Sequence, residues 1–245
     1  HIGYPLSANW EQRLRYRIER NDINDVQGSA SRFIEDQEGL RTTSAISQRL
    51  TYDTRNSRRF PTDGVRSWID TEVAGLGGDA NFVKAETGTS YYYPIAQNWT
   101  LNLVGEAGAI EAFANEEVEI NERFFIGSQK LRGFDQSGIG PRDLRTDDAL
   151  GGNRFYRGTV ELSFPLGLPE ELGISSHVFT DAGSLWDIDD SGTDLVDESS
   201  VRAAGGVGLS WRSPLGPIRM NFAVPYAEED FDEEKNFNFS FGTRF

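Results

Sequence analysis

The end of the chain, Phe237-Asn238-Phe239-Ser240-Phe241-Gly242-Thr243-Arg244-Phe245, alternates between aromatic and mostly small or polar residues. In an extended strand, successive side chains point to opposite faces, so Phe237, Phe239, Phe241 and Phe245 share one face. One apolar and one polar face fit a soluble sheet that covers a core. They also fit the closing strand of a transmembrane β-barrel, which is apolar outside and polar inside.

The same period of two recurs along most of the chain, and this period is typical of strands and not of helices. Mean hydropathy is −0.51, and no run approaches the ~18 apolar residues of a membrane helix. A barrel strand needs only ~9–11 residues, half of them polar. The segments with this pattern are 10–20, 65–73, 83–93, 99–109, 156–164, 201–212 and 218–224.

Short and long connections alternate between these segments. Short turns are expected at 60–64, 95–98 and 213–217, and longer polar stretches at 22–40, 111–121, 127–153, 187–200 and 226–236. An up-and-down barrel has this alternation because its turns are brief on one side and long on the other. The sequence therefore predicts an all-β, antiparallel, transmembrane barrel, with a soluble β-sandwich as the alternative.

Composition excludes several other classes of protein. A net charge of −15 argues against nucleic-acid binding, which needs a basic face. The absence of cysteine excludes disulfides and thiolate metal sites, and two histidines make a histidine-rich metal site improbable on counting alone. Gly205-Gly206-Val207-Gly208 lies inside an expected strand and is not a phosphate-binding loop. We therefore expect no cofactor and no metal.

The segment Gly127-Ser128-Gln129-Lys130-Leu131-Arg132-Gly133-Phe134, followed by Gly138-Ile139-Gly140-Pro141-Arg142, resembles the signature loop of the BamA family of outer-membrane protein insertases. Further similar motifs occur in the family's order over most of the chain. They are Phe60-Pro61-Thr62-Asp63-Gly64, Tyr93-Pro94-Ile95, Gly151-Gly152-Asn153, Val160-Glu161-Leu162-Ser163-Phe164-Pro165, Phe179-Thr180-Asp181-Ala182-Gly183-Ser184-Leu185-Trp186 and Ser213-Pro214-Leu215-Gly216-Pro217.

The resemblance implies a loop, residues 127–153, that folds into the barrel lumen. By strand alternation Glu161 and Asp181 face the same lumen, and the resemblance implies that Arg132 docks against both. A guanidinium is a planar fork of donors that suits a carboxylate. Gly133 is expected to allow close backbone approach, and Phe134 to pack against the wall.

The resemblance also implies domain organisation. The family has sixteen strands after periplasmic repeat domains, whereas about twelve strands are expected here. We therefore expect residues 1–245 to form a single C-terminal barrel region, mature or a fragment, without the repeats and the first strands. The family's lateral gate lies between its first and last strands. Its closing half would comprise Phe237, Phe239, Phe241, Gly242 and Phe245.

The function implied is insertion and folding of β-barrel proteins in the bacterial outer membrane through this gate. The implied partners are unfolded outer-membrane barrel substrates, assembly-complex lipoproteins, outer-membrane lipid and lipopolysaccharide. The alternatives are a two-partner secretion or autotransporter-assembly pore of the same superfamily, and a passive porin. An enzyme is not expected. His177 with Asp181 is the one candidate acid–base pair, and a packed lumen histidine is the favoured interpretation.

Overall fold

The structure is a computed structural model that describes residues 1–24, 30–114, 116–213 and 216–242. Phe245, which the sequence assigns to the gate, lies outside these described residues. Across the described residues the main sheet has eleven strands. They are β1 (Ile2–Pro5), β2 (Trp10–Ile23), β3 (Gly39–Asp53), β4 (Gly64–Ala74), β5 (Phe82–Ala96), β6 (Trp99–Ala112), β10 (Arg154–Pro165), β11 (Ile174–Trp186), β13 (Arg202–Ser213), β14 (Gly216–Ala227) and β16 (Phe237–Phe241).

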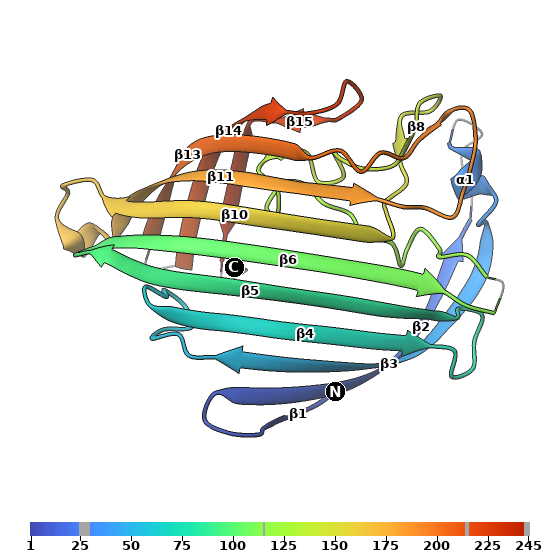
Figure 1. The fold of residues 1–245 in the computed structure, drawn as a ribbon, viewed down its shortest axis with the longest axis horizontal. Helices are drawn as coiled ribbons and strands as arrows, with labels where there is room; N and C mark the ends of the chain where they lie inside the picture. Colours follow the sequence, from blue (N-terminus) through green and yellow to red (C-terminus); the bar gives the residue numbers. More distant parts are fainter. Residues whose placement is uncertain (25–29, 115, 214–215, 243–245) are drawn as a thin grey trace.

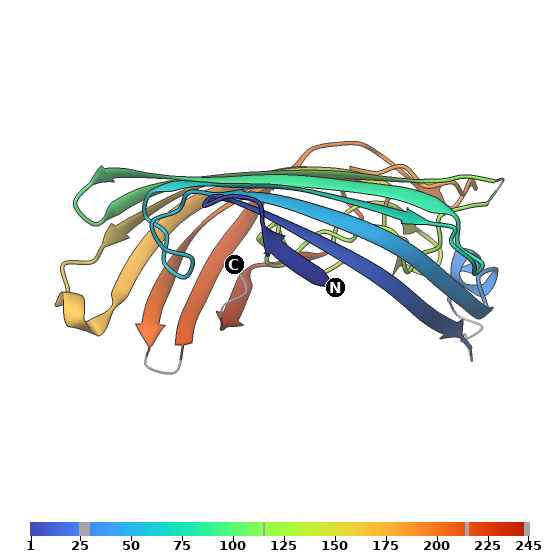
Figure 2. The same ribbon diagram turned by 90° about the horizontal axis from the view of Figure 1, so that it is seen from below.

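Each strand of this sheet pairs antiparallel with its neighbours in chain order, from β1 at one edge to β16 at the other. The sheet is strongly curved, and Figure 2 shows it as an arch. The predicted all-β, up-and-down arrangement is confirmed, with eleven strands in place of the approximate count of twelve.

The remaining elements are short and lie in the connections. They are α1 (Arg32–Glu35), the 3-10 turn η1 (Glu170–Leu172), β7 (Gly133–Phe134), β8 (Arg142–Asp143), β9 (Asp148–Ala149), β12 (Leu195–Val196) and β15 (Glu234–Lys235). The strands β12, β8 and β9 form one small sheet, and β15 pairs with β7 in another. In Figure 1, α1 and β8 lie at the end of the arch opposite the short β5–β6 and β10–β11 turns.

Strand β3 is absent from the segments that the sequence pattern identified. Its neighbours in register show which side chains share a face: Ile46 lies opposite Tyr16 on β2 and Val73 on β4. Ser44 and Gln48 fall on the same face as Ile46 because they lie two residues away from it. These polar residues interrupt the apolar row, so the period of two is weak in this strand.

The apolar rows cover the convex face and leave it without a covering layer. Ile46, Val207 and Phe222 are each about half exposed, at 49%, 54% and 54%. The buried core is on the concave side. There, the connection between β6 and β10, residues 113–153 and here called the inner loop, packs Ile126, Leu131 and Phe134 against wall residues that include Phe155 and Leu185.

No helix among the described residues has the length and apolar character required to cross a bilayer.

Two adjacent residues of β3 test the assignment of an apolar convex face and a polar concave face. Ile46 is exposed on the convex face, whereas Ser47 lines a polar hollow on the concave face. We expect Ile46→Arg to lower the free energy of unfolding by about 2–4 kcal/mol in lipid, because it places a charge in hydrocarbon. We expect Ser47→Arg to change it by less than about 1 kcal/mol, because the charge enters a polar hollow lined by both acidic and basic side chains. Urea unfolding in liposomes measures both, and equal effects would contradict the assignment of the faces.

Candidate functional site: an arginine buried against the inner wall

Arg132 follows Leu131, which is fully buried, and directly precedes the short strand β7. Its side chain lies against the wall formed by β10 and β11. The guanidinium is a fork on Asp181: Nε donates to Oδ2 at 2.7 Å and Nη2 donates to Oδ1 at 2.8 Å. The third nitrogen, Nη1, donates to Glu161 Oε2 at 2.7 Å. The structure therefore brings together the arginine and the two carboxylates that the sequence singled out.

Asp181 has further donors around it. The backbone N–H of Arg132 donates to Oδ2 at 3.1 Å, and Thr159 Oγ1 donates to Oδ1 at 2.8 Å. The Asp181 side chain is 1% exposed and that of Arg132 is 8% exposed. A buried charge is tolerated only when it is paired and hydrogen-bonded, and this carboxylate meets both conditions.

Arg219, on β14, is a fourth charged member of the site that the sequence did not predict. Its Nη2 donates to Glu161 Oε1 at 2.6 Å, so each Glu161 oxygen accepts from a different arginine. Two guanidinium groups then balance two carboxylates, Glu161 and Asp181. The available signal was the position of Arg219 on the polar face of its strand, but alternation alone does not reveal a partner several strands away.

The aromatic ring of Phe179 is the floor of the site. The Arg132 guanidinium carbon lies 3.3 Å from the centroid of this ring, which is a cation–π arrangement. The strand β13 beneath it carries Gly206 and Gly208. A Cβ at Gly206 would collide with the Phe179 ring and with Phe222 O, and a Cβ at Gly208 would collide with His177. The two glycines thus leave room for the rings of Phe179 and His177, which lie close to the β13 backbone.

Gly133 and Phe134 fix the backbone next to Arg132. Gly133 has φ +101°, and a Cβ there would lie 2.6 Å from Ala204 Cβ on β13. Phe134 is completely buried in the core between inner loop and wall. Gly133 thus lies close to β13, and Phe134 packs against the wall.

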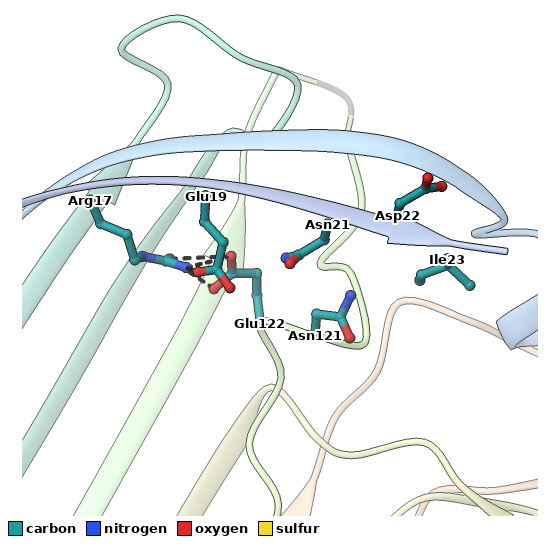
Figure 3. A pocket seen from close by; sticks show the side chains of 7 residues that line it. All are labelled: Arg17, Glu19, Asn21, Asp22, Ile23, Asn121 and Glu122. Atoms are coloured by element: carbon teal, nitrogen blue, oxygen red, sulfur yellow. Dashed lines mark hydrogen bonds and ion pairs between the residues drawn. The ribbon is translucent and has the colours of Figure 1, made fainter.

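A second ion-pair cluster holds the other half of the inner loop, as Figure 3 shows. Arg17 of β2 donates to Glu122 of the loop, with Nη2 3.0 Å from Oε2, and to Glu72 of β4 at 2.6 Å. Thr43 and Lys84 also contact Glu122, through its Oε1 at 3.2 Å and its backbone oxygen at 2.8 Å. The loop is therefore attached to both sides of the arch.

The two residues of the candidate acid–base pair, His177 and Asp181, have different hydrogen-bond partners. His177 is completely buried, and its Nε2 lies 2.7 Å from Asn221 Oδ1. Ser210 Oγ lies 3.4 Å from His177 Nδ1. Four residues along a strand correspond to a rise of about 13 Å, which separates His177 from Asp181.

The closing strand lies at the edge of the sheet. Phe237, Phe239 and Phe241 point to the convex face and are 56%, 57% and 58% exposed, and β16 pairs with β14 on one side. Gly242 has φ +103° directly after the strand, and its N–H donates to Pro217 O at 2.9 Å.

Removal of the guanidinium tests the energetics of the site. We expect Arg132→Ala to lower the free energy of unfolding by about 3–5 kcal/mol, because it leaves buried Asp181 without its charged partner. The control is Arg13→Ala, since the Arg13–Glu11 pair is half exposed on both sides and is worth about 0–1 kcal/mol. Urea unfolding of the two variants measures the difference, and similar losses would show that the buried site carries no special stability.

A pair of glycines separates backbone strain from collision. Gly133 and Gly77 both have positive φ, +101° and +98°, but a Cβ at Gly77 meets nothing within 4 Å. We expect Gly77→Ala to cost about 1–2 kcal/mol of stability from φ alone, and Gly133→Ala to cost more because of Ala204. Adding Ala204→Gly to Gly133→Ala should recover the excess. Equal losses at the two glycines would rule out the close approach.

Comparison with known proteins finds a family and several similar chains. The Omp85 superfamily domain matches residues 1–245. An outer membrane protein assembly factor BamA from Neorickettsia risticii is 33% identical over 97% of this chain and 32% of its own length. The corresponding factor from Nitratidesulfovibrio vulgaris is 30% identical over 100% of this chain and 30% of its own length. A SAM50-like protein from Schizosaccharomyces pombe is 30% identical over 91% of this chain and 48% of its own length.

The fold has a solved counterpart. The crystal structure of BamA from Haemophilus ducreyi lacking POTRA domains 1-3 superposes with a TM-score of 0.82, covering 97% of this chain and 52% of that chain at 23% identity. The chain spans about a third of the length of the bacterial relatives it matches. With a family match over its whole length and a barrel of the same architecture, the chain belongs to the Omp85 superfamily.

Proposed function

We propose that this chain is the membrane-embedded part of an outer-membrane protein assembly factor. Two bacterial relatives that match nearly the whole of this chain are named outer membrane protein assembly factors. The observation that carries the proposal is the buried docking of Arg132 on Asp181 and Glu161, in the order and surroundings implied by the family resemblance. The proposed location is the bacterial outer membrane.

The mechanism follows from the edge position of β16. A strand at the edge of a sheet presents backbone N–H and C=O groups that another strand can pair with. A substrate strand would add to this edge by backbone hydrogen bonding, and the substrate's own folding would drive insertion. The exposed Phe237, Phe239 and Phe241 keep the convex side of this edge apolar, as contact with lipid requires.

The inner loop favours an assembly role over a passive pore. It crosses the concave side of the arch and is attached to opposite walls through Glu122 and Arg132. A porin lumen is a water-filled channel, whereas this concave side contains a packed apolar core. We propose a non-enzymatic function without a cofactor, in which the substrates are unfolded barrel proteins. Assembly lipoproteins, lipid and lipopolysaccharide are the further partners that we propose.

Reconstitution of the full-length protein in liposomes tests the function. We expect it to speed the folding of an unfolded barrel substrate relative to empty liposomes, measured by heat-modifiable gel migration of the substrate. Arg132→Ala should slow this folding at least about tenfold, because each ~1.4 kcal/mol of lost docking lowers the ratio of docked to undocked loop by that factor. Arg13→Ala is the control that should retain the rate. No acceleration by the unaltered protein, or ion conductance as its sole activity, would refute the assembly role.

A further inference from the structure

The inner loop also contacts the segment that leads into the closing strand. This segment, residues 228–236 and here called the lead-in segment, connects β14 to β16. Within it, β15 pairs antiparallel with β7: Glu234 lies opposite Phe134, and Lys235 lies opposite Gly133. Two backbone hydrogen bonds extend the ribbon, from Asp135 N–H to Glu233 O at 2.8 Å and from Glu233 N–H to Gly138 O at 2.9 Å.

Arg142 holds the same segment from the far side of the loop. Its side chain is 2% exposed, and Nη1 donates to Glu233 Oε1 at 2.6 Å. The same nitrogen donates to Asp147 O at 2.9 Å, and Nη2 donates to Ser137 O at 3.2 Å. The inner loop therefore fixes the orientation of the Arg142 guanidinium through contacts that do not involve Glu233. The contact joins residues 91 positions apart in the chain.

The loop reaches the closing strand itself at one more point. Ser128 Oγ donates to Oδ1 of Asn238, a buried inward-facing residue of β16, at 3.2 Å. Ser128 N–H in turn donates to Phe134 O at 2.8 Å. The same short stretch of loop thus contacts both the lead-in segment and β16.

Only short stretches of chain separate these contacts from Arg132 on one side and from the closing strand β16 on the other. Arg132 immediately precedes β7, and Lys235 is separated from Phe237 by one residue. A shift of the Arg132 backbone must therefore move β7, and a shift of β15 must move the start of β16. Neither can be displaced far while the ribbon between β7 and β15 is intact.

The lead-in segment has one firm side-chain attachment and two weaker ones. Arg202 of β13 forms an ion pair with Asp232 at 3.0 Å, and both side chains are fully buried. By contrast, Glu233 is 50% exposed, and the Lys235–Asp135 pair is 46% and 43% exposed. The Lys235 ammonium and the Gln136 N–H hold the pKa of Asp135 below its ordinary value, so this carboxylate is charged at neutral pH. The Lys235–Asp135 pair is half exposed on both sides and is worth about 0–1 kcal/mol. Loss of Glu233 leaves the buried Arg142 guanidinium paired with Asp147 at 2.9 Å, so these contacts can open while Asp232 stays in place.

We propose that the inner loop is a releasable latch on the closing strand, with Arg142 as its positioning residue. In the closed state, Arg142–Glu233 and the β7–β15 ribbon hold β16 in register while Arg132 is docked. Release of the lead-in segment, with Asp232 as the fixed point, lets β16 move away from the loop. This inference rests on the proposed function for its consequence, the opening of the seam to a substrate strand.

Hydrogen exchange in the full-length protein tests the latch without any assay of assembly. We expect Glu233→Gln to speed amide exchange in residues 237–242 about two- to fivefold. This is the effect of losing up to ~1 kcal/mol from a pair whose carboxylate is half exposed and whose arginine keeps Asp147 as a partner. The control is Asp187→Asn, which removes the same charge from a 2.9 Å pair with Arg154, and the Asp187 carboxylate is 41% exposed, similar to that of Glu233. Exchange that is as slow in Glu233→Gln as in Asp187→Asn would overturn the latch.

Cross-linking tests whether release is needed for function. The chain has no cysteine, so Asp135→Cys with Lys235→Cys can be joined selectively by a short, reductant-cleavable, thiol-specific cross-linker. We expect substrate folding by the linked protein to fall at least about tenfold and to return when the link is cleaved. The control pair, Asn81→Cys with Glu116→Cys, replaces a 2.8 Å contact that ties the inner loop to the β4–β5 turn, and its link should leave folding unchanged.

The outcomes separate the two proposals. Equal activity of the linked and cleaved Asp135/Lys235 variant would overturn release of the latch and leave the assembly function standing. Absence of assembly activity in the unaltered protein would refute the proposed function, and the exchange experiment on β16 would still decide whether the loop holds the strand.

Discussion

The inverted distribution of apolar side chains is the constraint on which this structure depends. The convex face of the arch carries half-exposed aliphatic and aromatic residues with no protein layer over them. In hydrocarbon, such residues need no cover, but every backbone polar group must be paired within the protein, as the antiparallel ladder from β1 to β16 achieves away from its edges. The buried core must then form on the concave side, and the inner loop is the segment that supplies it.

An apolar core inside a polar wall requires charges to be matched on its boundary. Arg132 enters the wall beside Phe134 and Leu131, and it is accepted there because Asp181 and Glu161 bind all three of its guanidinium nitrogens. Arg219 balances the remaining carboxylate charge. The site therefore holds the inner loop against the wall and depends on all of its charged members, since loss of one leaves another buried charge unpaired.

The two attachments of the inner loop differ in what they connect. Glu122 fixes the loop to β2 and β4, far from the closing strand, through Arg17 and Glu72. Arg132 fixes it to β10 and β11, and the adjacent β7 extends this attachment to the lead-in segment. In this arrangement a single loop connects the docking site of Arg132 to the sheet edge where a substrate strand is proposed to add.

The sequence alone determined the faces of most strands, and its resemblance to a known family implied the pairing of Arg132 with Glu161 and Asp181. Alternation is a local property, so it identifies which side chains share a face, as it does for Phe237, Phe239 and Phe241. Alternation did not identify β3, because Ser44 and Gln48 interrupt the apolar row on its convex face. A local pattern contains no information on the neighbouring strands that accommodate these polar residues. Only the tertiary structure decided the partners of Arg219, Glu122 and Arg142. Those contacts join residues 58, 105 and 91 positions apart, and sheet curvature and loop path, not periodicity, bring them together.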